Sequence, residues 1–193
     1  MYKRQQLEHE SIPGVFESLK VTTRAACERI ARHAYELARQ QGRKKVTIVH
    51  KANIMKKSDG MFLATARAVG EEYKDIETED CIVDALCMKL ILHPEWFDVL
   101  LCGNLFGDIV ADLCTGLVGG RANAPSANIG PNVSIFTTGH RSRTAEDTGL
   151  LFSATLMLKH LGQNDAAQRF ARACQTALKA QPEALLPAIK AAL

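Results

Sequence analysis

Short apolar runs alternate with helical stretches along most of this chain, and that alternation constrains the fold more than any other feature. Four apolar runs predict strands: KVTIVH (45–50), DCIVD (80–84), FDVLLC (97–102) and VSIFTT (133–138). The stretches around them predict helices at 22–41, 61–73, 85–93 and 104–118. Because strands that alternate with helices are typical of βαβ units, the sequence predicts an α/β fold with a largely parallel sheet.

The last third of the chain has a different character. Residues 116–132 are rich in Gly, Asn and Pro, which predicts a long loop. Ala- and Leu-rich stretches at 150–161, 164–180 and 183–192 predict helices. No G-x-G-x-x-G follows a predicted strand, so the ordinary dinucleotide-binding fingerprint is absent.

Composition argues against several classes of protein. The 193 residues carry a net charge of +3, which is too small to predict a nucleic-acid or membrane-surface partner. There is no apolar span long enough for a transmembrane helix, and the start MYKRQQLEHES has no signal-peptide core. The six cysteines form no C-x-x-C pair and mostly lie in apolar runs. They predict buried thiols of a reducing compartment rather than disulfides or a zinc site.

Two aspartates stand on the apolar helical stretch NLFGDIVADL (104–113) with no Lys or Arg nearby. Asp108 and Asp112 are four residues apart, so a helix places them on one face. If exposed, such a like-charge pair costs only about 0.2–0.5 kcal/mol, so a plain solvated helix face remains open. The alternative is that both carboxylates bind a cation.

Three further polar residues are predicted near strand ends. Asp84 closes the strand at 80–84, and Lys51 and Asn53 follow the strand at 45–50. Ligands of parallel sheets gather beyond the carboxyl ends of the strands, so these residues are expected to meet there with the two aspartates. Three carboxylates would repel unless a hard cation such as Mg²⁺ or Mn²⁺ neutralised them. Such an ion would chelate a hydroxy acid while Lys51 moved a proton; an ordinary surface lysine is the alternative.

At these residues the sequence resembles the metal-dependent β-decarboxylating dehydrogenases of isocitrate and isopropylmalate, and within them the NAD-dependent isocitrate dehydrogenase branch. The resembling stretches are LEHES (7–11), VTIVHKANIMK (46–56), SDG (58–60), IVD (82–84), FDVLLCGNLFGDIVADLCTGLVGG (97–120), SANIG (126–130) and LLFSATLMLKHLG (150–162). Several long motifs in one order make the resemblance specific. It implies the α/β isocitrate/isopropylmalate dehydrogenase fold, which binds NAD without a Rossmann glycine motif.

The resemblance also implies a reaction and a metal site. Enzymes of this family oxidise the 2-hydroxyl of isocitrate, pass a hydride to NAD and lose CO₂ from the β-position, as in the tricarboxylic acid cycle. The family's ligands for Mg²⁺ or Mn²⁺ fall on Asp84, Asp108 and Asp112, with Asp84 contributed across a dimer interface. A homo- or hetero-oligomer built on a dimer is therefore expected.

Three other roles follow from the same resemblance. The catalytic lysine falls on Lys51, and a residue near substrate and nicotinamide falls on Asn53. The histidine of the loop that holds the adenosine falls on His140, whereas the family's ribose-binding acid is not carried over, although Asp147 lies in the same stretch. The polar stretch that follows His140 is shorter than the family's loop.

The chain departs from the family's pattern in its length. A family chain is nearly twice as long, and this sequence begins where the second half would, so we expect one partial domain over 1–193. The match covers 7–162, and 163–193 form a helical tail. The missing half should carry a nucleotide-binding segment and the Ser, Asn and Arg residues that grip substrate carboxylates. Because that half is missing, the chain is expected to be inactive alone. Arg4 stands where the family has its catalytic tyrosine, so that role is not carried over.

Three functions remain open at this point. The first is an NAD-dependent isocitrate dehydrogenase by descent. The second is a related dehydrogenase of isopropylmalate, homoisocitrate or tartrate, and the third is a non-catalytic partner of a full-length subunit. The expected compartment is the bacterial cytoplasm, with the mitochondrial matrix as the alternative.

Overall fold

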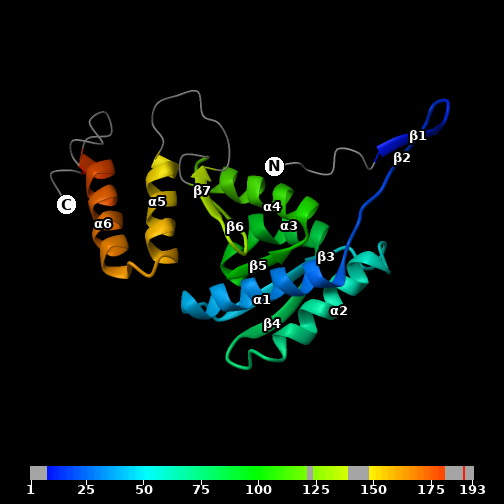
Figure 1. Cartoon of the computed structure of the whole chain (residues 1–193), viewed down its shortest axis with the longest axis horizontal. Helices are drawn as coiled ribbons and strands as arrows, with labels where there is room; N and C mark the ends of the chain where they lie inside the picture. The colour runs from blue at the N-terminus through cyan, green and yellow to red at the C-terminus, as the bar shows by residue number, and fades with distance from the viewer. Residues whose placement is uncertain (1–7, 121–123, 139–147, 181–188, 190–193) are drawn as a thin grey trace. The chain divides into compact units, whose positions relative to one another are not determined.

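The structure, a computed structural model, describes residues 8–120, 124–138, 148–180 and 189 (Figure 1). The chain divides into two compact units, Met1–Val110 and Ala111–Leu193. In chain order the elements are β1 (Glu8–Ile12), β2 (Val15–Ser18), α1 (Arg24–Gln40), β3 (Lys45–His50), α2 (Ser58–Gly70), β4 (Glu77–Ile82), α3 (Val83–Leu92), the short 3₁₀ helix η1 (Pro94–Trp96), β5 (Val99–Cys102), α4 (Asn104–Leu117), β6 (Pro125–Ile129), β7 (Ser134–Thr138), α5 (Thr148–His160) and α6 (Asn164–Ala180).

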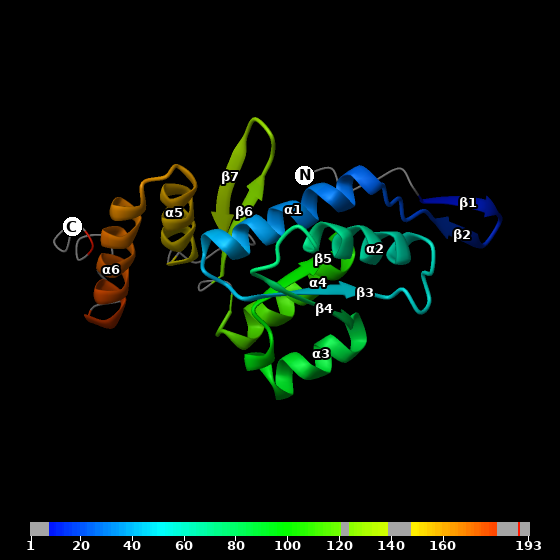
Figure 2. The same ribbon diagram turned by 90° about the horizontal axis from the view of Figure 1, so that it is seen from below.

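A three-stranded parallel sheet forms the centre of the first unit. Its strand order is β4-β3-β5, and both pairings are parallel, as the alternating pattern predicted. Helices α1 and α2 cover one face and α3 lies on the other (Figure 2). Val46, Ile48 and Val49 of the central strand β3 are fully buried, because a parallel strand between two helical layers has no solvent face.

A buried tyrosine joins α1 to the sheet in this core. Tyr35 is fully buried, its ring stacks on Tyr73 at a centroid distance of 5.1 Å, and its hydroxyl lies 2.8 Å from that of Thr78. Burial raises the pKa of the phenol, so the hydroxyl stays neutral. Gly70 packs against the same hydroxyl, where a Cβ would lie only 2.5 Å from it. The end of α2 therefore has room for glycine alone.

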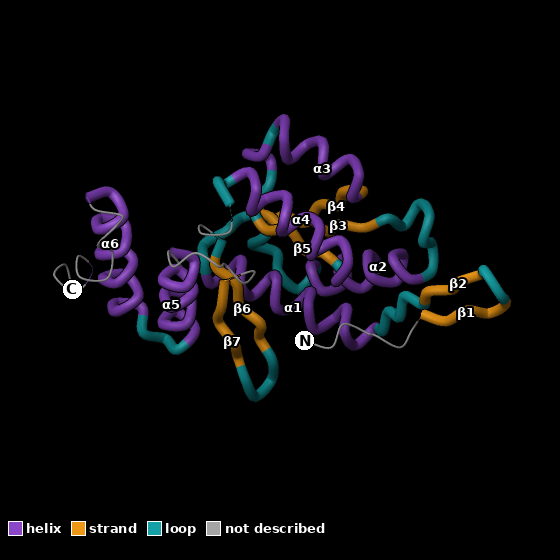
Figure 3. Tube along the Cα trace, turned by 90° about the horizontal axis from the view of Figure 1, so that it is seen from above, coloured by secondary structure: helices purple, strands orange, loops and turns teal. Residues whose placement is uncertain are grey.

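The second unit contains an antiparallel pair, β6 and β7, packed on α5 (Figure 3). Sequence reasoning predicted β7 but placed β6 inside a long loop at 116–132, which was wrong. The β6 sequence PSANI has little strand character, and pairing with β7 supplies the hydrogen bonds that make it a strand. Fully buried Ser153 of α5 accepts a hydrogen bond from the Ser126 N–H at 3.3 Å and ties the helix to this pair.

The start of the described chain forms a β1–β2 hairpin that the sequence did not predict. All nine residues of the two strands are exposed, and their few apolar side chains do not alternate with polar ones. Gly14 forms the turn with a φ of +82°, a conformation that favours glycine. The six cysteines are all free thiols: Cys27, Cys81 and Cys174 are buried, and Cys87, Cys102 and Cys114 are partly buried.

Candidate active site

The carboxyl ends of the three parallel strands lie at one edge of the sheet. The register pairs His50 with Ile82 in one direction and Val49 with Cys102 in the other. The segments that leave these ends, the turn after β3 and the starts of α3 and α4, are therefore neighbours. This is the edge at which ligands of open α/β sheets bind.

Asp84 lies in the first turn of α3 and does not end a strand. The predicted strand at 80–84 was wrong at its end, because β4 stops at Ile82 and the helix begins at Val83. The apolar pair Ile82-Val83 suits either conformation, so the pattern alone did not place the boundary. An acid in the first helical turn is favoured by the N-terminal partial charge of the helix.

Lys51 and Asp84 form an ion pair. The Lys51 Nζ lies 2.6 Å from an Asp84 carboxylate oxygen, although 33 residues separate them in sequence. The Lys51 hydrogen bond, together with backbone N–H groups at the start of α3, holds the pKa of the Asp84 carboxyl below its usual value. The lysine side chain is 24% exposed and the aspartate 68%, so the carboxylate stays open to solvent and to a ligand.

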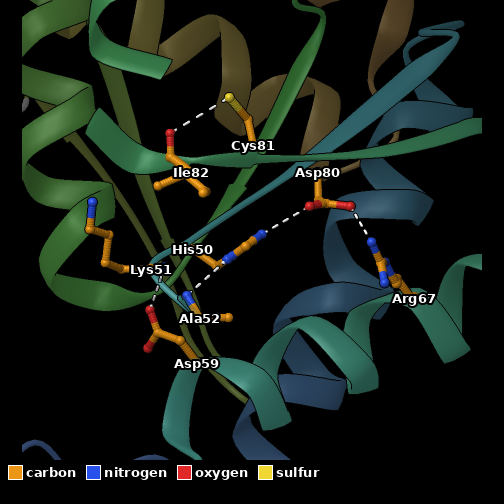
Figure 4. Close-up of polar contacts among 8 residues, drawn as sticks. All are labelled: His50, Lys51, Ala52, Asp59, Arg67, Asp80, Cys81 and Ile82. Carbon is orange, nitrogen blue, oxygen red and sulfur yellow. Dashed lines mark hydrogen bonds and ion pairs between the residues drawn. The ribbon is translucent and has the colours of Figure 1, made fainter. Parts of the chain in front are cut away.

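A hydrogen-bonded chain fixes the residue just before the lysine (Figure 4). Buried His50 accepts the Ala52 N–H at its Nδ1, at 3.0 Å, so its Nε2 carries the proton and donates to Asp80 at 3.0 Å. Arg67 of α2 holds the other Asp80 oxygen. Burial would raise the pKa of Asp80, but the His50 and Arg67 hydrogen bonds outweigh it and lower that pKa.

A buried carboxylate holds the lysine backbone itself. Asp59 is only 4% exposed, and one of its oxygens accepts the Lys51 N–H at 2.8 Å (Figure 4). The other oxygen accepts from the Lys20 ammonium at 2.5 Å. His50 and Asp59 therefore clamp the backbone on both sides of the Lys51 Cα, which fixes the origin of its side chain.

The other predicted site residues are placed more loosely. Asn53 is exposed on the turn after β3, and Asp108 and Asp112 are exposed on α4, four residues apart. Within the described part of the chain, no three His, Cys, Asp or Glu side chains lie close enough together to hold a metal ion. The structure thus joins Lys51 to Asp84 without grouping the three aspartates. His140 and Asp147 lie outside the described residues.

A cavity of about 640 Å³ opens beyond the carboxyl ends of β3 and β5. It is bordered by Val49 and Cys102 at the strand ends, and by Asn104 at the start of α4. The clamp residue Asp59 and its partner Lys20 also line it. The volume lies within the range of small-molecule sites, which is about 300–1,000 Å³.

Sequence reasoning gave no role to the residues that position the lysine. Asp59 was noted only as part of the SDG motif, and Asp80 only as part of a predicted strand. The sequence offered one signal, which is that charged residues lying among apolar core positions need hydrogen-bonding partners when they are buried. Buried, paired groups of this kind often support a site. Their partners could not be read from the sequence, since 30 residues separate His50 from Asp80 and 39 separate Lys20 from Asp59.

Comparison with known proteins gives consistent matches. The family model described as isocitrate/isopropylmalate dehydrogenase matches residues 2–185. The chain is 44% identical over 187 residues to isocitrate dehydrogenase [NAD] subunit 2, mitochondrial, of Schizosaccharomyces pombe, covering 92% of this chain and 49% of that protein. It is 44% identical over 172 residues to the 3-isopropylmalate dehydrogenase of Archaeoglobus fulgidus, covering 86% of this chain and 53% of that one.

A solved structure also matches. The isocitrate dehydrogenase of Methylococcus capsulatus superimposes with a TM-score of 0.88 at 37% identity, covering 96% of this chain and 63% of that chain. Measured against the two curated relatives above, the chain spans about half of their length. No helix among the described residues is both long and apolar enough to cross a membrane.

Proposed function

This chain belongs to the isocitrate/isopropylmalate dehydrogenase family, and from that premise we propose that it derives from an NAD-dependent isocitrate dehydrogenase. In this proposal residues 1–193 carry the lysine and the carboxylates of the reaction, and the other binding groups belong to the part of the family chain that these residues do not span. The observation that carries the proposal is the clamped Lys51, whose Nζ lies 2.6 Å from Asp84 at the carboxyl edge of the parallel sheet.

The carboxylates fit the proposed metal in their chemistry. Asp108 and Asp112 are exposed on one helix face, and their carboxylate oxygens are the kind of ligand that a hard cation prefers. The bound Mg²⁺ or Mn²⁺ would supply a Lewis acid for the substrate's oxygens. Asp84 offers the third carboxylate, and its pKa lies below the ordinary value for an aspartate.

Lys51 is placed to accept and return the proton of a substrate hydroxyl. The Asp84 carboxylate that pairs with Lys51 is mostly exposed. A substrate or a cation that bound this carboxylate would therefore release the Lys51 amine. The amine acts as a base only in its deprotonated form. The His50 and Asp59 contacts fix the backbone from which this amine reaches the substrate.

The remaining binding groups are proposed to come from other parts of the protein. Asn53 stands two residues beyond Lys51 and would contact substrate and nicotinamide, and His140 would hold the adenosine of NAD. The side chains that grip the substrate carboxylates would come from the half of the family chain that has no counterpart here. The S. pombe relative extends over about twice the matched length, which leaves room for such a half.

An oligomer and a compartment are part of the same proposal. Met88, Ile91 and Leu92 of α3 are each more than half exposed, at i, i+3 and i+4 of a helix, which is the spacing of a helix-docking face. The S. pombe relative is by its name a subunit, and this exposed apolar face supports a dimer-based assembly here.

We propose the bacterial cytoplasm as the compartment of this chain. The alternative is the mitochondrial matrix, because the name of the S. pombe relative describes it as mitochondrial.

A second candidate function is the oxidation of isopropylmalate. The A. fulgidus enzyme of that name is as identical to this chain as the S. pombe subunit is. The third is a non-catalytic partner of a full-length subunit, for which the exposed α3 face is the supporting observation. A shift in mass on mixing with a complete subunit, without NADH, would favour this third function.

The direct test mixes the purified chain with isocitrate, Mg²⁺ and NAD and follows NADH. We expect little or no turnover from residues 1–193 alone, because they span only about half the length of the relatives they match. Robust turnover would refute the need for a second half. Reading the coding DNA in all frames upstream of Met1 and around codon 140 tests separately whether the chain is a fragment of a longer reading frame. Finding no further family segment in any frame would contradict that fragment hypothesis.

A further inference from the structure

Lys20 lies on the short segment between β2 and α1 and contacts three separate segments of the first unit. Its ammonium donates to an oxygen of Asp59, the second residue of α2, at 2.5 Å, and to the Met55 sulfur, on the turn after β3, at 3.6 Å. It also lies 5.1 Å from the centre of the Phe106 ring, in the first turn of α4. This one side chain therefore joins the turn after β3, the start of α2 and the start of α4.

The three contacts suit a lysine ammonium. It has three N–H donors, which can point to a carboxylate and a thioether at the same time. A cation within about 6 Å of a ring centre is attracted to the face of the ring. The Lys20 side chain is 35% exposed, so water competes for it less than for a fully exposed lysine. These contacts together hold the ammonium in one place.

Asp59 transmits the placement of Lys20 to Lys51. The Asp59 carboxylate is buried, and its second oxygen accepts the Lys51 N–H at 2.8 Å (Figure 4). A buried carboxylate is stable as an anion only while partners compensate its charge. Without the Lys20 ammonium, Asp59 would turn toward water and release the Lys51 N–H. The backbone position from which the Lys51 amine reaches Asp84 therefore depends on Lys20.

Phe106 connects the same lysine to α4. The Phe106 side chain is partly buried, and it lies two residues before Asp108, one of the candidate metal ligands. The next residue, Gly107, donates its N–H to the Gly103 carbonyl at 2.8 Å and closes the first turn of the helix. A change in the position of the ring therefore moves the turn that precedes Asp108. Because Lys20 contacts this ring, the ammonium and the first turn of α4 move together.

We propose that Lys20 is a positioning residue that couples the placement of the Lys51 amine to the first turn of α4. It acts on Lys51 through Asp59 and on α4 through the Phe106 ring. The inference rests on the proposed role of Lys51 as the base of the reaction, and it adds a residue that keeps this base in register with the helix that carries Asp108. The sequence pattern gave no sign of this role, because all three partners of Lys20 are at least 35 residues away in the chain.

The test measures amide hydrogen exchange by NMR in the native chain and in Lys20→Met, which removes the charge and keeps most of the side-chain volume. We expect exchange at the Lys51 and Gly107 amides to speed up by about tenfold or more, and exchange at Ile48 in the centre of β3 to stay within about twofold. Lys20→Arg keeps the cation and should restore both rates to within about threefold of the native ones. Unchanged rates at Lys51 and Gly107 would overturn the proposal. Equal acceleration at Ile48 would also overturn it, because it would show only a global loss of stability.

The matched control is Lys45→Met. Lys45 also pairs with a carboxylate, that of Glu79 at 3.4 Å, and its side chain is 22% exposed, so both substitutions remove a partly buried, paired cation from the same unit. It lies at the start of β3, at the opposite end of the strand from Lys51. We expect Lys45→Met to leave exchange at Lys51 and Gly107 within about twofold of the native rates. Acceleration equal to that of Lys20→Met would contradict a specific role for Lys20.

Phe106→Leu tests the coupling from the other side, and it does so even if Lys20→Met fails to fold. Leucine removes the ring but keeps an apolar side chain, so the Lys20 ammonium loses its aromatic contact. We expect exchange at the Lys51 amide to speed up by about threefold or more. In a ¹³C titration, the pKa of Asp84 should rise toward its ordinary value in Lys20→Met and in Phe106→Leu, because its ion pair with Lys51 loosens, and should not move in Lys45→Met. A Phe106→Leu chain with native exchange at Lys51 and a native Asp84 pKa would overturn the coupling.

These measurements use no substrate, so their failure is distinguishable from failure of the proposed function. Coupled exchange at Lys51 and Gly107, with no NADH from isocitrate when both halves of a family chain are supplied, would support the role of Lys20 and contradict the proposed reaction. NADH formation by the two halves, with exchange at both amides unaffected by Lys20→Met, would do the reverse.

Discussion

Replacing Asp59 by asparagine tests whether the clamp on Lys51 has the strength that its contacts imply. Asp59 is 4% exposed and accepts hydrogen bonds from the Lys51 N–H at 2.8 Å and the Lys20 ammonium at 2.5 Å. Hydrogen bonds to charged groups contribute about 1.5–3 kcal/mol each. Asparagine keeps one acceptor oxygen but turns an NH₂ group toward one of the two donors. We therefore expect Asp59→Asn to lower the free energy of unfolding by about 2–3 kcal/mol.

The assay is urea denaturation followed by the fluorescence of Trp96, the only tryptophan, which lies in the same unit. The control is Asp75→Asn, because Asp75 pairs with Arg39 and both side chains are about half exposed. Exposed pairs contribute about 0–1 kcal/mol, so the control should be much milder. If Asp59→Asn were no more destabilising than Asp75→Asn, the reasoning about the buried clamp would be refuted.

Three further substitutions test the core, the ion pair and the histidine chain. Gly70→Ala should lower the free energy of unfolding by about 1–3 kcal/mol, because the new methyl group clashes with the buried Tyr35 hydroxyl. Gly60→Ala, where nothing lies within contact distance, should raise the free energy of unfolding by about 0.5–1 kcal/mol. Equal thermal midpoints for the two variants would contradict this packing. Lys51→Met should raise the pKa of Asp84 toward its ordinary value of about 3.9 in a ¹³C NMR titration, and an unchanged pKa would mean that the pair is absent in solution. Because the folded pKa of Asp80 is depressed, its contribution to stability is present above the unfolded value of about 3.9 and is lost as pH falls through the folded pKa. The difference in urea midpoint between the native chain and Asp80→Asn should therefore shrink on acidification, and a constant difference would count against the network.

The central elements could be predicted because their patterns are unambiguous. Strand β3 occupies the predicted residues 45–50, since KVTIVH is rich in β-branched residues and lies between a basic turn and a polar one. The start of α3 was wrong by a few residues because Ile82 and Val83 suit either a strand or a helix. Strand β6 was missed because its residues become a strand only by pairing with β7.

The candidate site could be predicted only in part, for a related reason. The edge rule for parallel sheets correctly brought Lys51 near Asp84, because register fixes where strand ends lie. It could not supply the clamp of His50, Asp80 and Asp59, whose contacts depend on side-chain packing between distant segments. The roles of Asp108 and Asp112 stay predictions, because the metal and the partner that would gather them are separate molecules.

The most direct test of the account is NADH formation from isocitrate by this chain with and without the unmatched half of the S. pombe relative. The account predicts NADH only when both halves, NAD and Mg²⁺ are present, and its loss in Lys51→Met and Asp112→Asn. Equal NADH from this chain alone would contradict the account, and so would a stable complex of the two halves that formed none.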